Sequence, residues 1–525
     1  MKFEYFTVFL LLCFLGPIAS LKILQFSPTF SRSHAMFTNR LSESLGSRGH
    51  KVVIWNTQDS RVVPLTPPSH PNVTNYYIPC DMVKMVGVFP NITFVEPSMK
   101  QFFHVFNTFM NEWVACCQLQ LDQYQHLIDE LKKEKFDLAI GQVIDGCSSI
   151  IMHELGIDKA VWVSAATYVF DYVTSIMAYA TMPSYIPNLA SAHSNIMTFW
   201  ERFLNSIFTT RGQNSIYFSS SHWFKERIIF QQPPFQDRPD LLDVKRQIYF
   251  THLLNGDRLL DFPRPFPYGV TYLGDMSSSQ GSQSEYDSLD GEFLKIADQR
   301  SCVILFSLGT IAKAENMPST MSKSFVDGLS NFTDCSVIWR FGGELPDAGR
   351  HSNIHLKSWI PQKALLKHPK TRLFITHGGY NSLIESTKAG VPLIVMPLFA
   401  DQMGNAFRVE RLGFGLSLHK SKVTTEAVRS KVSQILSNAR YAERARAISD
   451  MYDDNPVSPE YLLDSILRII VKHPLRFPKL RVAQKLSLVK LYCIDVLLFW
   501  VALAVFSFLG LVSIGFSRLD NSPCF

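Results

Sequence analysis

The stretch LFITHGGYNSLIES, residues 373–386, carries the most information about the fold of this chain. Its first three residues are apolar and partly β-branched, as in a buried strand. Apolar residues then return at helical spacing over 383–387, and Gly390 followed by Pro392 supplies the end of a helix. We therefore predict a buried strand, a tight turn and a helix.

The turn in this stretch has the composition of an anion site. The first N–H groups of a helix lack internal partners and lie at its positive end, and glycines let those groups approach an anion closely. A phosphate is the natural ligand, although the glycines can also serve backbone freedom alone. Asn381 and Glu385 share one helix face, one turn or roughly 5.4 Å apart. A carboxylate there suits a ribose diol; alternatively, Glu385 only complements the helix N-terminus.

Length and composition limit the class of protein. A chain of 525 residues is long enough for two globular domains. With 46% hydrophobic and 18% charged residues, it is not a disordered protein. The net charge of +6 comes without a long basic stripe, so no nucleic-acid partner is implied. The nine cysteines show no CxxC or metal-ligand spacing, so the sequence argues for neither a disulfide framework nor a zinc site, and it leaves the disulfide pairing open.

Both ends of the chain are specialised for a membrane. Residues 1–20 contain a basic residue, an apolar centre and small residues at their end, which is typical of a secretory signal peptide. Residues 496–516 contain no charge and would span about 31 Å as a helix, enough for a bilayer core. Residues 517–525 would form a short cytoplasmic tail. We predict a single-pass type I protein with its bulk in the lumen.

The charges beside the span disagree with this topology. Only Arg518 follows the span, and the positive-inside rule would place the long side in the cytosol. The basic residues before the span are Arg476, Lys479, Arg481, Lys485 and Lys490. We give priority to the signal peptide, because it commits the chain before the last span is made. The basic flank would then lie on the lumenal membrane surface. Sequons at Asn72, Asn91 and Asn331 support the lumenal assignment.

The rest of the chain falls into two similar halves. Residues 21–55 have the pattern strand, loop, helix, strand, and the same pattern begins again at residue 301, after the linker SSSQGSQS at 277–284. Two doubly wound parallel-sheet domains follow, with ligands at the carboxyl ends of their strands. Residues 102–117 form an apolar helical face, which is either core or the wall of an apolar pocket.

Residues 359–402, WIPQKALLKHPKTRLFITHGGYNSLIESTKAGVPLIVMPLFADQ, strongly resemble the signature of the UDP-glycosyltransferases, which include the glucuronosyltransferases of the endoplasmic reticulum. FSLGT, VIWRFGG, PSYIP and LRVAQKLS are also similar to segments of that family. The resemblance implies the GT-B fold, an α/β architecture of two Rossmann-like domains that face each other. The implied parts are a signal peptide (1–20), an acceptor domain (21–284), a UDP-sugar domain (285–455), C-terminal helices with a juxtamembrane segment (456–495), a transmembrane helix (496–516) and a tail (517–525).

The same resemblance implies a role for individual residues of the donor site. Trp359 would stack on uracil, with Gln362 as a hydrogen-bonding neighbour. Glu385 would take the ribose hydroxyls, and Asp401 and Gln402 those of the donor sugar. The residues around the diphosphate would be Ser307, Arg340, His377, Gly379, Asn381 and Ser382. No metal ion is implied, because the helix dipole and Arg340 can stabilise the leaving diphosphate.

The family uses an early histidine as its base, and SRSHAMF places His34 at that position. Ser33 can cap the helix, and a helix N-terminus disfavours a charged imidazole. A neutral imidazole is the form that accepts a proton. Without the resemblance, a solvent-facing histidine at a helix start would be the simpler interpretation.

The chain departs from the family at the acid that partners this base. The segment FDLAIGQVIDGC has Gln142 where the family has a carboxylate. A glutamine can orient a histidine but cannot stabilise its positive charge. Asp145 is the nearest substitute, and its alternative role is that of a turn residue.

The predicted function is that of an inverting glycosyltransferase in the endoplasmic reticulum. It would move a hexose or hexuronic acid from UDP-glucose or UDP-glucuronic acid to a hydroxyl of a small lipophilic acceptor, as in detoxification. The alternative is a catalytically weak or inactive UDP-sugar-binding membrane protein, suggested by Gln142. The sequence does not decide whether the chain forms a homo-oligomer.

Overall fold

The computed structural model describes residues 20–520 with short interruptions. The interruptions are 30–31, 60–67, 82–92, 97, 144, 146, 166, 168, 170, 178–180, 189–192, 214–221, 232–238, 267–268, 275, 277–288, 290, 346, 455–456, 475–487 and 492. The predicted signal peptide, the linker at 277–284, the sequon at Asn91 and most of the basic flank therefore lie outside the described residues.

The first sheet has seven parallel strands in the order β3-β2-β1-β4-β5-β6-β7. Its strands are β1 (Lys22–Thr29), β2 (Lys51–Gln58), β3 (Val73–Pro79), β4 (Leu138–Gln142), β5 (Ala160–Ser164), β6 (Tyr249–Asn255) and β7 (Val270–Gly274). Strands β4, β5 and β6 are buried along their whole length, because helices cover both faces of the sheet.

The helices of this half connect successive parallel strands, as a parallel sheet requires. They are α2 (Arg32–Ser47), α5 (Met99–Gln123), α6 (Gln125–Lys132), α7 (Cys147–Glu154), α8 (Asp171–Met177), α9 (Phe199–Gln213), α10 (His222–Phe230) and α11 (Leu241–Ile248). Helix α2 follows β1 directly, so its first turn lies at the carboxyl edge of the sheet.

The second sheet has six parallel strands in the order β10-β9-β8-β11-β12-β13. Its strands are β8 (Cys302–Ser307), β9 (Cys335–Arg340), β10 (Ile354–Lys357), β11 (Thr371–Thr376), β12 (Leu393–Val395) and β13 (Gly415–Ser417). Its helices are α12 (Gly291–Asp298), α13 (Ser319–Leu329), α14 (Gln362–Lys367), α15 (Tyr380–Lys388), α16 (Gln402–Leu412), α17 (Thr425–Ser437) and α18 (Ala439–Asp453), with 3₁₀ turns η4 (Ala314–Asn316), η5 (Ala348–Arg350) and η6 (Lys420–Lys422).

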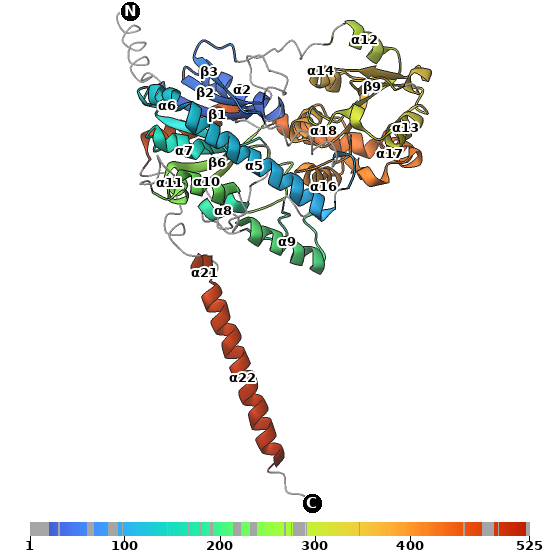
Figure 1. Cartoon of the computed structure of the whole chain (residues 1–525). Coiled ribbons are helices and arrows are strands. Elements are labelled where there is room, and N and C mark those ends of the chain that lie inside the picture. Colours follow the sequence, from blue (N-terminus) through green and yellow to red (C-terminus); the bar gives the residue numbers. More distant parts are fainter. Residues whose placement is uncertain are drawn as a thin grey trace, which may run out of the picture.

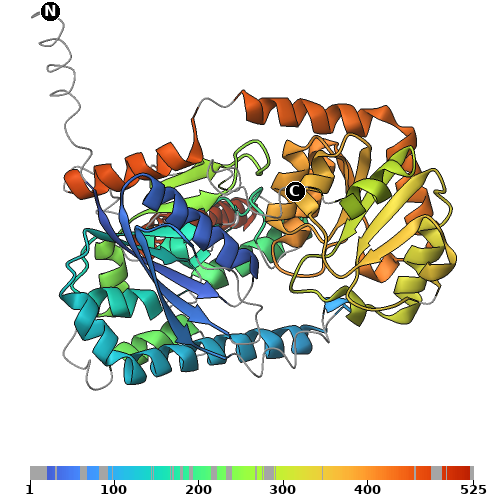
Figure 2. The same cartoon turned by 90° about the horizontal axis from the view of Figure 1, so that it is seen from above.

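These two α/β halves lie side by side (Figures 1 and 2), and the predicted fold class is confirmed. The strand order reverses between β1 and β4 in the first sheet and between β8 and β11 in the second. Such switch points open a crevice at the carboxyl ends of the strands, where doubly wound folds bind ligands. The strand, turn and helix predicted for 373–386 are β11, the turn after it and α15.

The last helix of the body returns from the second half to the first (Figure 2). This helix, α19 (Pro459–Lys472), buries Leu463, Leu467 and Ile470 in the same apolar cluster as β1 and α2. At its side, Nε2 of His50 lies 2.7 Å from a carboxylate oxygen of Asp464. The domain boundaries expected from the sequence stay a prediction.

A short segment of the first half inserts into the core of the second. Phe94, 4% exposed, belongs to the apolar cluster of the second sheet together with Leu308 and Leu398. Nζ of Lys420 donates to the carbonyl oxygens of Thr93, at 3.2 Å, and of Leu398, at 2.9 Å. The two halves are therefore joined through side chains as well as through the chain.

Helices α21 (Leu488–Leu491) and α22 (Ile494–Asp520) lie outside the body (Figure 1). Within the part of the chain that is described, one helix is long and apolar enough to cross a membrane. It covers Ile494–Val512, with a mean hydropathy of 2.4, and none of it is buried. Figure 1 shows that α22 extends away from the body on the side where α8 and α9 lie.

The structure supplies the cysteine pairing that the sequence leaves open. Within the described residues, the bonded pairs are Cys80–Cys116, Cys117–Cys147 and Cys302–Cys335. The first two fasten α5 to the end of β3 and to the start of α7, and the third joins the neighbouring strands β8 and β9. The partners lie 30 to 36 residues apart, so they meet only in the folded chain. On the apolar face of α5, Trp113 and Cys117 belong to the buried part of the first half.

We predict that Phe94→Ala lowers the free energy of unfolding by about 3–5 kcal/mol, because it leaves a cavity in the core of the second half. The neighbouring Val95 is 56% exposed and provides the matched control. Val95→Ala should stay within about 0.5 kcal/mol of the natural protein. Thermal unfolding of the detergent-solubilised protein measures both, and equal effects would show that Phe94 does not hold the halves together.

Candidate active site

The turn between β11 and α15 is packed too tightly for side chains other than those present. Gly309 lies in the loop after β8, and a Cβ atom there would lie 2.5 Å from Cε1 of His377. A Cβ atom on Gly379 would lie 2.5 Å from Nε2 of the same ring. Gly378 has φ +82°, and a Cβ atom there would meet Cγ1 of Val395 at 2.5 Å. The glycines therefore serve both the close approach of the backbone and the left-handed turn.

The imidazole of His377 lies between these glycines at the start of α15. Burial, helped by the nearby charge of Arg340, lowers the pKa of His377 to about 4. The ring is therefore neutral at pH 7 and can donate one hydrogen bond without adding charge. Ser307, the last residue of β8, pairs with Thr376, the last residue of β11, so it lies directly beside this turn.

Arg340, at the end of β9, links the turn to the predicted base-stacking residue. Its Nη1 donates to the carbonyl oxygen of Gly309 at 2.6 Å, and its guanidinium lies 4.8 Å from the centre of the Trp359 ring. Trp359 is 37% exposed, which leaves part of its indole accessible to a flat ligand. The structure thus brings Arg340 and Trp359 together with the glycine turn between β11 and α15.

Gln362, Ser382 and Glu385 form a second contact group at the same helix start. Nε2 of Gln362 lies 2.7 Å from Oε2 of Glu385 and 3.1 Å from Oγ of Ser382. Gln362 begins α14, and the other two lie on the first turns of α15. The predicted uracil and ribose contacts therefore adjoin each other.

Asp401 and Gln402 lie at the start of α16, after the carboxyl end of β12. Nδ2 of Asn405 donates to Oδ2 of Asp401 at 2.9 Å and to the carbonyl oxygen of Gly378 at 2.8 Å. This amide therefore joins the predicted sugar-binding carboxylate to the glycine turn. The preceding residue, Ala400, has φ +55°. Residues other than glycine rarely adopt this backbone conformation, and it is often found at functional sites.

The side-chain oxygen of Gln402 contacts the protein backbone. Its Oε1 accepts hydrogen bonds from the backbone N–H groups of Leu398, at 2.9 Å, and Phe399, at 3.1 Å. The oxygen therefore braces the loop after β12. A sugar hydroxyl would have to be met by the amide nitrogen of Gln402.

The predicted base His34 lies in the first turn of α2, and Gln142 is its neighbour at the end of β4. Nδ1 of His34 is 3.2 Å from Oε1 of Gln142. The amide orientation is fixed, because Nε2 of Gln142 donates to Oγ1 of Thr38 at 2.8 Å while that hydroxyl donates to the carbonyl of His34 at 3.0 Å. Oε1 can only accept, so Nδ1 carries the proton and the lone pair of the neutral ring is on Nε2.

Burial keeps this imidazole neutral. It lowers the pKa of His34 below the ordinary value, although the hydrogen bond to Gln142 acts in the opposite direction. A neutral ring with its lone pair on Nε2 is the form that can accept a proton from an alcohol.

Asp145, which the sequence offers as a partner of His34, makes its contacts at α7 and α5 instead. Its carboxylate accepts from the backbone N–H groups of Cys147 and Ser148 at the start of α7 and from the side chain of Trp113. Burial raises the pKa of Asp145 to about 6, while these hydrogen bonds and the charge of Lys245 act against that rise. Asp145 is thus held by α7 and α5. The sequence suggests both Gln142 and Asp145 as partners of His34. In the structure, Gln142 is the one that contacts the imidazole.

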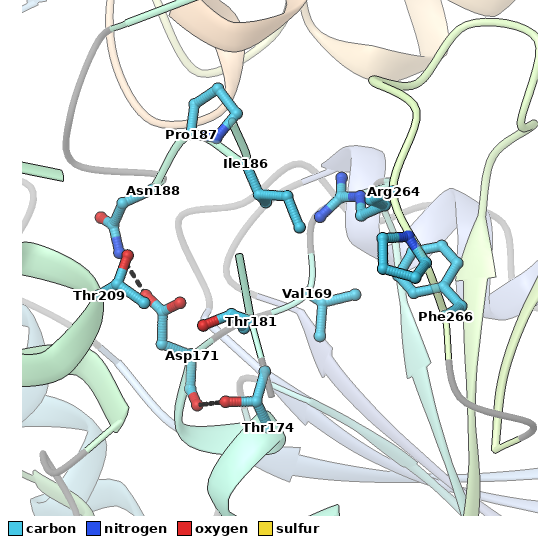
Figure 3. A pocket seen from close by; sticks show the side chains of 11 residues that line it. Val169, Asp171, Thr174, Thr181, Ile186, Pro187, Asn188, Thr209, Arg264 and Phe266 are labelled. Atoms are coloured by element: carbon cyan, nitrogen blue, oxygen red, sulfur yellow. Dashed lines mark hydrogen bonds between the residues drawn. The ribbon is translucent and has the colours of Figure 1, made fainter. Parts of the chain in front are cut away.

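A pocket that is partly open to solvent lies at the same carboxyl edge of the first sheet (Figure 3). It is lined by Val169, Asp171, Thr174, Thr181, Ile186, Pro187, Asn188, Thr209, Arg264, Pro265 and Phe266. Figure 3 shows Arg264 and Phe266 on one side of the pocket and Asn188 and Asp171 on the other, with Nδ2 of Asn188 donating to Asp171. Asn205 of α9 binds the carbonyl oxygens of Pro183 and Ile186 and so holds the segment that forms one wall.

Contacts between the halves make the two carboxyl edges face each other. Nδ2 of Asn255, the last residue of β6, lies 3.4 Å from Oδ1 of Asn381 in the first turn of α15. The backbone N–H of Asp257 donates to the hydroxyl of Tyr380 at 3.1 Å. A Cβ atom on Gly256 would lie 2.6 Å from that hydroxyl oxygen, so only glycine fits. His34 lies on the same edge as Asn255, three strand positions away.

Sequence reasoning missed Asn405 and the residues that join the halves, among them Asn255, Tyr380 and Arg408. For Asn405 a signal was available, because it lies four residues after Asp401 and hence on the same helix face. The others contact residues that are more than 100 positions away, which no local pattern indicates. Among the described residues, no group of three or more His, Cys, Asp or Glu side chains could hold a metal ion.

Comparison with known proteins places the whole chain in one family. The family model described as UDP-glucoronosyl and UDP-glucosyl transferase matches residues 22–519. The Caenorhabditis elegans protein ugt-60, named as a UDP-glucuronosyltransferase, is 30% identical over 466 residues, which is 87% of this chain and 90% of the relative. The 2-hydroxyacylsphingosine 1-beta-galactosyltransferase of Rattus norvegicus is 27% identical over 88% of this chain and 82% of the relative.

Solved structures agree on the fold. The calicheamicin glycosyltransferase CalG4 matches with a TM-score of 0.59 at 16% identity, over 87% of this chain and all of that one. The glycosyltransferase of kitacinnamycin matches with a TM-score of 0.55 at 18% identity, over 86% of this chain and 99% of that one. The chain therefore belongs to the UDP-glycosyltransferase family and is an enzyme that transfers a sugar from a UDP-sugar.

Proposed function

We propose that this enzyme moves a hexose or hexuronic acid from UDP-glucose or UDP-glucuronic acid to a hydroxyl of a small acceptor, with inversion at the anomeric carbon. The observation that carries this proposal is the contact between Nδ1 of His34 and Oε1 of Gln142. It leaves the lone pair on Nε2, at a sheet edge that faces the helix start of α15. Rat 2-hydroxyacylsphingosine 1-beta-galactosyltransferase is named for a lipid acceptor, which supports a lipophilic acceptor here.

The donor would be held by the second half. The uracil ring would stack on Trp359. The ribose hydroxyls would bond to Glu385, which already accepts a hydrogen bond from Gln362. The diphosphate would lie at the helix start among the residues of the glycine turn and Arg340. Asp401 and the amide nitrogen of Gln402 would meet the sugar hydroxyls.

The reaction would be a single displacement. Nε2 of His34 takes the proton of the acceptor hydroxyl while its oxygen bonds to the anomeric carbon, and the bond from that carbon to the diphosphate oxygen breaks. UDP leaves with the electron pair of that bond. The N–H groups of α15 and Arg340 stabilise the developing negative charge, which is the main electrostatic contribution expected of such a site.

The acceptor would enter the pocket at the edge of the first sheet. Val169, Ile186 and Phe266 offer apolar surface, and Asp171 and Thr181 offer polar groups. This mixed lining suits a lipophilic molecule that carries a few hydroxyl or carbonyl groups, with the reacting hydroxyl directed toward His34.

We infer that the enzyme is anchored in the membrane of the endoplasmic reticulum by α22, with both halves in the lumen. The disulfides support an oxidising compartment, because such bonds are rare in the cytosol. Asn331, the acceptor of a sequon, is exposed after α13, as a lumenal glycosylation site requires.

A second candidate function is that of a UDP-sugar-binding protein with little or no turnover. The observation that favours it is the neutral amide of Gln142 beside His34, since an amide cannot stabilise the imidazolium that forms when the base accepts a proton.

We predict that His34→Ala lowers the rate of transfer by about 10²–10⁴-fold, because it removes the base. UDP binding should be unchanged, since the proposed nucleotide site belongs to the other half. Release of UDP from a donor panel measures the rate, and calorimetry with UDP measures binding. An unchanged rate would refute the proposed base, and absent turnover of the natural protein with every donor and acceptor would favour the second candidate.

We predict that Gln142→Asp raises the pKa of His34, because a carboxylate stabilises the charged ring. The acidic limb of kcat/KM should move to higher pH by about one unit, and the rate above that limb should rise. In the natural protein the limb should lie below pH 6.5, since burial lowers this pKa. Asp145→Asn is the control and should leave the limb in place. A limb that moves with Asp145→Asn and not with Gln142→Asp would reverse the assignment.

We predict that sealed microsomes protect everything but a short C-terminal tail from added protease. Asn331→Gln should remove one glycosidase-sensitive step in mobility, because the exposed sequon would be modified in the lumen. An antibody to the tail follows the cytosolic end. Digestion of the large domains from outside would show that the basic flank, and not the signal peptide, sets the topology.

A further inference from the structure

A buried ion pair joins the two halves beside the proposed sugar site. Nε and Nη2 of Arg408, on α16, donate to Oδ1 of Asp261 at 3.1 and 2.7 Å. Asp261 belongs to the loop that follows β6 in the first half. The side chains of Arg408 and Asp261 are 6% and 1% exposed. The pair is therefore removed from water, and its geometry depends on both halves.

More positive than negative charge surrounds this carboxylate. Arg264 donates to Oδ2 of Asp261 at 2.6 and 3.0 Å, and Arg411 donates to its backbone carbonyl at 2.7 Å. Burial alone would raise the pKa of Asp261, but the charges of Arg264 and Arg408 outweigh it and hold the pKa at about 2. Asp261 is therefore a carboxylate at neutral pH and holds the guanidinium of Arg408 in place.

Arg408 is connected to the carboxylate of Asp401 through a single residue, Asn405. Its Nη1 donates to Oδ1 of Asn405 at 2.9 Å, and Nδ2 of Asn405 donates to Asp401 and to the carbonyl of Gly378. A guanidinium can only donate, so Arg408 determines which end of the Asn405 amide faces Asp401. Burial raises the pKa of Asp401, while the hydrogen bond from Asn405 and the charge of Arg408 act against that rise.

We propose that Arg408 is a positioning residue for the donor sugar: held by Asp261 of the other half, it orients Asn405 and thereby the carboxylate of Asp401. The inference rests on the proposed role of Asp401 toward sugar hydroxyls. Its consequence is that the sugar part of the donor is recognised only when the two halves are joined at this pair. UDP alone makes no use of Asp401 and should bind without it.

The test compares the KM for the UDP-sugar with inhibition by UDP in the full-length enzyme. Arg408→Met should raise the donor KM about 10- to 100-fold, the effect of losing a charge-assisted hydrogen bond. Inhibition by UDP should change less than about threefold. Asn405→Ala cuts the same connection without touching the ion pair, so it keeps the test valid if Arg408→Met does not fold. Arg411→Met is the matched control, because Arg411 contacts Asp261 but has no bond to Asn405; its donor KM should stay near that of the natural enzyme.

A double-mutant cycle separates positioning from general loosening. If Arg408 acts through Asp401, Arg408→Met combined with Asp401→Asn should raise the donor KM no more than Asp401→Asn alone. Additive effects, or an equal loss of UDP inhibition, would overturn the inference while the role of Asp401 remains. An unchanged donor KM in Asp401→Asn would instead show that Asp401 does not meet the sugar, and both the proposed sugar contact and the inference would be wrong.

Discussion

The contact between the end of β6 and the start of α15 is the constraint on which the rest of the site depends. The hydroxyl of Tyr380 packs over Gly256 so closely that a methyl group would not fit, and Asn255 reaches Asn381 one residue further on. Because all strands in each sheet are parallel, this one contact aligns both carboxyl edges. It places the start of α15 at the sheet edge on which His34 also lies. Neither edge alone could bring the proposed donor site and the proposed base together.

Each half then prepares its groups by burial. His34 and His377 both occupy environments that lower their pKa values, so both rings are neutral at physiological pH. Burial is the main cause for both rings, but their neighbours differ. His377 lies near Arg340, in a turn without room for larger side chains, and can donate a hydrogen bond next to an anion. His34 is oriented by an amide, which fixes the tautomer but leaves the imidazolium without a counter-charge.

Much of the fold and of the local geometry at the candidate donor site could be predicted, because the signals are local. The turn at 377–379 is short in sequence, and its glycines, strand and helix are adjacent in the chain, so their spacing reports their geometry directly. The same holds for the helix face shared by Asn381 and Glu385. The disulfides and the partner of His34 could not be predicted in this way. Cys117 and Cys147 meet only after α5 has packed on the sheet, and the choice between Gln142 and Asp145 depends on which side chain reaches the ring.

The sequence by itself determined two α/β halves, the strand-turn-helix unit that can hold a phosphate, and an apolar segment long enough for a bilayer. These follow from periodicity and from backbone sterics, which act over a few residues. The tertiary structure decided how the halves are joined: through Phe94, through Tyr380 on Gly256, and through Arg408 on Asp261. Those contacts connect positions more than 100 residues apart, so they depend on the packing of whole sheets, which sets distances that no local pattern contains.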